Sequence, residues 1–92
     1  MEIKTVPGNN KGKVMHYALS TCGWCAKTRE FLDELGVSYS YVYIDLLSDK
    51  DNAEAVSALE SWNPRVSFPT VVINDQVVVV GYHPDMIEEA LD

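Results

Sequence analysis

The spacing of apolar and polar residues changes several times along the chain, and each change predicts a new element. Short apolar runs rich in β-branched and aromatic residues, bounded by turn-forming residues, are typical of strands. Longer stretches whose apolar residues recur every three or four positions are typical of helices. On these criteria we expect strands at 13–19, 37–46, 70–73 and 77–80, and helices at 22–35, 48–62 and 84–91.

The order of these elements predicts a single α/β domain over residues 1–92. The first two strands are joined through a helix, so they should be parallel with a right-handed crossover. Asn74 and Asp75 predict a turn that makes the last two strands an antiparallel hairpin. Residues 1–12 contain two glycines and a proline, and we expect a leading arm that pairs weakly or frays. The expected architecture is a four-stranded mixed sheet flanked by three helices, in the order β-α-β-α-β-β-α.

The composition limits the classes of function that the chain can have. Hydrophobic residues make up 47% of the 92 residues, which is enough for a core without a disulfide staple. The net charge of −7 argues against strong nucleic-acid binding. No basic stretch followed by an apolar run opens the chain, and no apolar segment approaches the length of a membrane span. We therefore expect a cytoplasmic protein that binds neither nucleic acid nor membranes.

Both cysteines of the chain, Cys22 and Cys25, lie in one C-x-x-C motif where the first strand gives way to the first helix. A structural disulfide here would stabilise little, because a crosslink over so short a loop removes little entropy from the unfolded chain. A zinc site needs about four ligands, and only His16 and His83 are left to complete one. We favour a redox couple. The alternative is an iron–sulfur cluster held between two chains, with Cys22 contributed by each.

The position of the motif gives the two thiols different roles. Helix N-termini carry unpaired N–H groups and a partial positive charge, which stabilise a thiolate. We expect Cys22 to lie exposed at the cap and act as the nucleophile, and Cys25 to lie partly covered in the first turn and resolve the mixed disulfide. Trp24 should offer a flat apolar contact to a partner. Lys27 should tune the acidity of the nucleophilic thiol. With Arg65 it forms either a small cationic rim around the pair or ordinary solvated surface charge.

Three segments of the sequence resemble the glutaredoxins and related small thioredoxin-fold redoxins. They read CGWC at 22–25, SFPT at 67–70 and GYHPDMI at 81–87, and the similarity covers nearly everything after the leading arm. The resemblance implies a thioredoxin-like fold, a catalytic pair of cysteines, and a loop with a cis bond before Pro69 that packs against their disulfide. The substrate-binding residues that we expect around the pair are Trp24, Arg65, Phe68, Pro69, Thr70, Gly81 and Tyr82.

The end of the chain departs from ordinary glutaredoxins. The stretch from Gly81 to Asp85 looks more like the NrdH-redoxins, which donate electrons to ribonucleotide reductase. Leu19 stands where many glutaredoxins place a basic residue shortly before the first cysteine. Two features that bind glutathione in that family are therefore missing or altered, and the resemblance implies weak use of glutathione.

The sequence as a whole predicts a dithiol–disulfide oxidoreductase that reduces protein disulfides through Cys22 and Cys25, with ribonucleotide reductase as one acceptor that the resemblance suggests. A flavoprotein disulfide reductase or a low-molecular-weight thiol should recycle it. We expect a monomer with no metal and no cofactor beyond its own redox-active disulfide. The alternative is the iron–sulfur module named above, acting as a dimer.

Overall fold

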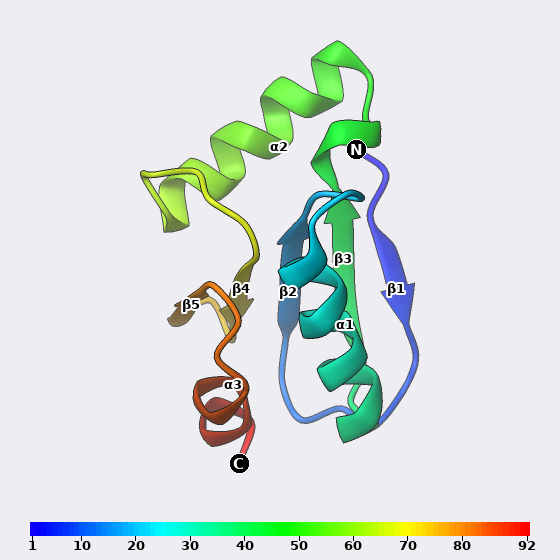
Figure 1. Cartoon of the computed structure of the whole chain (residues 1–92), viewed down its shortest axis with the longest axis vertical. Helices are drawn as coiled ribbons and strands as arrows, with labels where there is room; N and C mark the ends of the chain where they lie inside the picture. The colour runs from blue at the N-terminus through cyan, green and yellow to red at the C-terminus, as the bar shows by residue number, and fades with distance from the viewer.

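Five strands form one mixed sheet in the computed structural model, which describes all 92 residues (Figure 1). The order across the sheet is β1-β3-β2-β4-β5. β2 and β3 are parallel, as the crossover through a helix requires, and the other neighbours are antiparallel. The strands are β1 Lys4–Val6, β2 Val14–Ala18, β3 Tyr39–Tyr43, β4 Thr70–Ile73 and β5 Val77–Val80.

The expectation of four strands is corrected by β1, which belongs to the leading arm. Thr5 pairs with Ser40 of β3, and the two hydroxyl oxygens lie 3.3 Å apart. Asn9 adds an isolated bridge to Val37. A strand of three residues is too short to show a period in the sequence. Its pairing with β3 covers an edge that β3 would otherwise expose.

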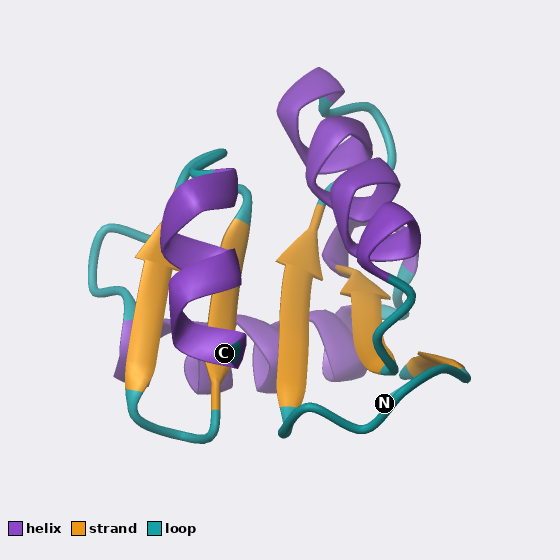
Figure 2. Ribbon diagram, turned by 90° about the horizontal axis from the view of Figure 1, so that it is seen from below, coloured by secondary structure: helices purple, strands orange, loops and turns teal.

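Three helices cover the two faces of the sheet: α1 Gly23–Leu35, α2 Asp49–Trp62 and α3 Pro84–Leu91. α1 and α3 share one face and α2 crosses the other (Figure 2). On the first face Leu32 of α1 and Ile87 of α3 pack on Val71 of β4, and all three side chains are fully buried. On the second face Leu59 of α2 packs against the sheet. No helix of the structure is long and apolar enough to span a lipid bilayer.

Single residues with known local preferences form the helix ends and the hairpin turn. Gly36 ends α1 in the left-handed conformation, with φ of 68°. The Ser48 hydroxyl caps α2 by accepting a hydrogen bond from the Asp51 N–H at 3.3 Å. Asn74 and Asp75 both have positive φ, 54° and 52°, as the tight turn between β4 and β5 requires.

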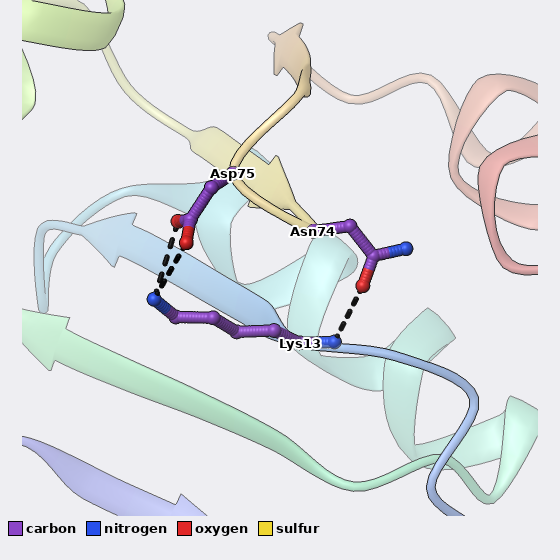
Figure 3. Close-up of polar contacts among 3 residues, drawn as sticks. All are labelled: Lys13, Asn74 and Asp75. Carbon is purple, nitrogen blue, oxygen red and sulfur yellow. Dashed lines mark hydrogen bonds and ion pairs between the residues drawn. The ribbon is translucent and has the colours of Figure 1, made fainter.

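The hairpin turn is held against the start of β2 by Lys13 (Figure 3). Its N–H donates to Asn74 Oδ1 at 2.9 Å, and its Nζ lies 3.0 Å from Asp75 Oδ2. Both ends of the ion pair are exposed, so it adds at most about 1 kcal/mol to stability.

The strand expected at 37–46 is shorter than predicted, because the chain turns into a 3₁₀ helix, η1, over Ile44–Leu46. Ile44 still enters the core beside α2, whereas Asp45 is exposed. The apolar pattern alone does not separate the two conformations, since Ile44 is buried in either.

Candidate active site

Cys22 is the N-cap residue of α1, as the sequence predicted. Its backbone is extended, with φ of −93° and ψ of 116°, and its sulfur accepts a hydrogen bond from the Cys25 N–H at 3.2 Å. The side chain is partly exposed. The first turn of α1 therefore donates an N–H to a sulfur that solvent and substrate can reach.

Cys25 lies one turn into α1 with only 1% of its surface exposed. Burial raises the pKa of its thiol to about 12. A hydrogen bond to the Cys22 sulfur and the charges of Cys22 and Asp45 act in the same direction, while a backbone hydrogen bond with Leu19 opposes them. Both cysteines are free, and Cys25 is held as a neutral thiol.

A groove without lysine, arginine, aspartate or glutamate lies beside the N-terminus of α1. Its walls come from three separate segments, and the residues that line it are Trp24, Phe68, Pro69, Gly81, Tyr82 and His83. Trp24 stacks on Tyr82, with ring centroids 5.7 Å apart and planes 21° apart, yet 62% of its surface stays exposed. The Phe68–Pro69 peptide bond is cis, and the Gly81 N–H donates to the Pro69 carbonyl at 2.8 Å. Five of the seven residues expected to bind substrate thus meet in one groove.

The other two residues of that set lie elsewhere. Thr70 is fully buried, and its hydroxyl donates to the Ser67 carbonyl at 2.8 Å, so its side chain supports the loop from behind. Arg65 is exposed and does not line the groove; its N–H donates to Asn63 Oδ1 at 3.2 Å. Lys27 is exposed in a shallow hollow with Gly23 and Trp24. Both side chains are exposed, and the cationic rim expected around the thiols stays a prediction.

Arg29, which follows the motif in sequence, contacts tyrosines of β3. Its Nη1 donates to the Tyr43 hydroxyl at 2.9 Å, and the guanidinium lies 3.9 Å from the centre of the Tyr41 ring. These contacts fasten α1 to β3 and so fix the helix that carries the cysteines.

Two polar groups near the site were not found from the sequence. Asn63 is buried at the end of α2, and its Nδ2 donates to Ser67 at 3.0 Å and to Thr70 at 3.1 Å, which shapes the loop before Pro69. Asp45 accepts hydrogen bonds from Ser20, two residues before Cys22. Asn63 is typical of a helix end, but no local pattern could have paired Ser20 with a residue of η1.

The two histidines that a metal site would need lie in different surroundings. His16 is fully buried in β2 and neither ring nitrogen has a hydrogen-bond partner, whereas His83 is exposed at the start of α3. No group of three or more histidine, cysteine, aspartate or glutamate side chains is close enough to hold a metal ion.

This dithiol geometry occurs in a chain with clear relatives. A family model for glutaredoxin matches residues 14–78. The crystal structure of the glutaredoxin from Methanosarcina mazei Go1 is 47% identical, with a TM-score of 0.89 over 97% of this chain and 86% of that one. The structure of Methanosarcina acetivorans methanoredoxin is 44% identical, with a TM-score of 0.88 over 91% of this chain and 88% of that one.

Curated sequences are more distant. The Gene 56 protein of Mycobacterium phage D29 is 30% identical over 83% of this chain and 79% of its own length. The chain spans about half the length of the plant glutaredoxins that it also matches. Because the glutaredoxin model covers well over half of its residues, the chain belongs to the glutaredoxin family, whose members are thiol–disulfide oxidoreductases.

Proposed function

We propose that this chain reduces disulfides in protein substrates, with Cys22 as the nucleophile and Cys25 as the resolving thiol. One observation carries the proposal: the Cys22 sulfur caps α1 at the surface and accepts the Cys25 N–H, while the Cys25 thiol is buried directly behind it. One sulfur is thus open to attack a substrate and the other is shielded from it.

The exchange takes two steps. The Cys22 thiolate attacks one sulfur of the substrate disulfide, the substrate S–S bond breaks, and the departing substrate thiolate takes up a proton. Cys25 then loses its proton to solvent and attacks the Cys22 sulfur of the mixed disulfide. The Cys22–Cys25 bond forms, the second substrate thiolate leaves, and two electrons have passed from the dithiol to the substrate.

The environment of Cys25 changes between these steps in a way that favours the second. Two of the causes that raise its pKa are the hydrogen bond to Cys22 and the charge on Cys22. Both are removed once Cys22 is bonded to the substrate. The Cys25 thiol therefore stays protonated in the reduced protein and becomes easier to ionise once a mixed disulfide has formed.

The lining of the groove favours segments of proteins as substrates. Its lining contains aromatic rings, a proline and backbone, with no lysine, arginine, aspartate or glutamate. Such a surface suits an extended, largely apolar stretch beside a disulfide. The same lining offers no permanent cation to the carboxylates of glutathione, which supports recycling by a flavoprotein disulfide reductase.

A role as electron donor to ribonucleotide reductase rests on the NrdH-like segment from Gly81 to Asp85 and is part of the proposal. We also propose a cytoplasmic location, because a dithiol stays reduced in that compartment.

The choice of electron source is tested by a coupled assay at matched redoxin concentration. We expect turnover with a thioredoxin-reductase-type flavoprotein and weak turnover with millimolar glutathione. Losing one charge-assisted hydrogen bond to the tripeptide costs roughly 1.5–3 kcal/mol, or about tenfold to a hundredfold in affinity. Saturable turnover with glutathione and none with any flavoprotein reductase contradicts the proposed recycling route.

The redox group and the oligomeric state are tested on the same protein purified without oxygen. The proposal is a monomer whose redox group is the cysteine pair alone. Colourless protein that elutes as a monomer and carries no iron supports it. A brown, iron-containing dimer supports the iron–sulfur alternative instead.

A further inference from the structure

Asp45 holds the loop that leads to the nucleophilic cysteine. Its Oδ1 accepts the Ser20 N–H at 2.8 Å, and its Oδ2 accepts the Ser20 hydroxyl. Asp45 lies in η1, beyond the end of β3, while Ser20 lies just after the end of β2. The contact therefore joins the ends of two neighbouring parallel strands.

The loop that Asp45 holds contacts both cysteines. The Cys22 N–H donates to the Leu19 carbonyl at 3.3 Å, and the Cys22 sulfur in turn accepts the Cys25 N–H at 3.2 Å. Leu19 and Ser20 are adjacent, so a displacement of Ser20 is transmitted to Cys22 through Leu19, and from Cys22 to the first turn that carries Cys25. Arg29 anchors the helix itself to β3, and Asp45 is the side chain that hydrogen-bonds the loop before Cys22 from outside that loop.

We propose that Asp45 is a positioning residue for the dithiol: by accepting two hydrogen bonds from Ser20, it fixes the Leu19–Cys22 loop in the conformation that both exchange steps use. The inference rests on the proposed function, because it concerns the rates of the same two steps.

The charge of Asp45 acts on the same site. Hydrogen bonds from the Ser20 side chain and backbone lower the pKa of Asp45, so its carboxylate stays ionised where the protein works. The ionisable groups that act on Cys25 are Cys22, in the loop before α1, and Asp45, in η1, and both raise the pKa of Cys25. In a variant without the Asp45 charge, Cys25 should therefore ionise at lower pH. A variant that only weakens the hydrogen bonds between Ser20 and Asp45 should leave the ionisation of Cys25 unchanged.

Stopped-flow reaction with a chromogenic aromatic disulfide separates the two steps, because one coloured thiolate is released by Cys22 and the second by Cys25. Ser20→Ala removes the hydroxyl bond and keeps the charge. Asp45→Asn removes the charge and keeps an oxygen that can accept the Ser20 N–H. Glu60→Gln is the control, since Glu60 is an exposed acid of α2 that makes no hydrogen bond or ion pair through its side chain.

We expect both loop variants to slow both releases by about fivefold, the effect of one lost hydrogen bond. The pH midpoint of the second release should move lower in Asp45→Asn, less at high salt, and stay in place in Ser20→Ala. Rates and midpoints equal to those of Glu60→Gln in both variants overturn the inference. If Asp45→Asn does not fold, an unchanged rate in Ser20→Ala overturns it alone. Absence of both releases in the unaltered chain is a different result and contradicts the proposed function.

Discussion

At the scale of single residues, the roles proposed for the two cysteines rest on the cap position of Cys22 and the burial of Cys25. The C-x-x-C spacing and the start of a helix are local signals, so the sequence could place Cys22 at the cap and Cys25 in the first turn. The contact between Ser20 and Asp45 could not be predicted, because it joins residues 25 positions apart whose meeting depends on the packed sheet. Thr70 was expected to contact substrate and is instead buried, since the pattern of a strand does not reveal which face a loop will cover.

The first prediction concerns the order in which the thiols react. Iodoacetamide should modify Cys22 well before Cys25 at neutral pH. The Cys22 sulfur caps α1 at the surface, where the reagent can reach it, whereas burial raises the pKa of Cys25 to about 12. Peptide mass spectrometry of samples quenched at increasing times measures both. Equal labelling in the folded protein, with unfolded protein as the control for intrinsic reactivity, contradicts the assignment of roles.

At the scale of elements, the segments with strong local signals were predicted almost to the residue. The hairpin strands at 70–73 and 77–80 and the helix at 84–91 agree with the structure. β1 and η1 were not predicted, because each spans three residues and is set by pairing or packing with distant parts of the chain. The groove combines the first turn of α1, the loop before β4 and the loop before α3. The sequence supplied its residues through a family resemblance and could not supply the stack between Trp24 and Tyr82.

The second prediction tests that stack. Tyr82→Ala should raise the KM for a protein disulfide roughly three- to tenfold, because an aromatic pair contributes about 0.5–1.5 kcal/mol and one wall of the groove is lost. The effect on kcat should be smaller, since no ring of this pair takes part in the exchange. Met86→Ala is the matched control, as Met86 is an exposed apolar residue of α3 outside the groove. A KM equal to that of the control argues against substrate binding over Tyr82.

At the scale of the whole molecule, the α/β architecture and its thioredoxin-like class agree with the prediction, with one strand more than expected. The crossover rule and the hairpin turn fix most of that topology. What the sequence could not show is that His16 is fully buried without a partner for either ring nitrogen, since a histidine in a strand is as often half-exposed.

The third prediction follows from that burial. Desolvation, aided by the charge of Arg29, lowers the pKa of His16 from 6.5 to about 4. The unfolded chain binds the proton first, so the stability that neutral His16 contributes is complete above pH 6.5 and is lost as the pH falls toward 4. The free energy of unfolding should fall by about 3 kcal/mol over this range of pH.

Urea denaturation between pH 7 and pH 4 measures the effect. His16→Leu should flatten this part of the pH dependence, whereas His83→Leu, at an exposed position, should keep it. The carboxylates titrate equally in all three proteins, so the difference between the curves isolates His16. Parallel curves for His16→Leu and the unaltered chain contradict the prediction.

The central claim is an ordered exchange in which Cys22 attacks and Cys25 resolves, and trapping with single-cysteine variants tests it most directly. Each variant is incubated with a disulfide-bearing protein, and the covalent complex is counted on a non-reducing gel and by intact mass. Cys25→Ser should accumulate a mixed disulfide with the substrate, because its Cys22 can attack and nothing resolves the product. Cys22→Ser should form none, because the remaining thiol is buried. Equal trapping by the two variants, or trapping by Cys22→Ser alone, contradicts the account.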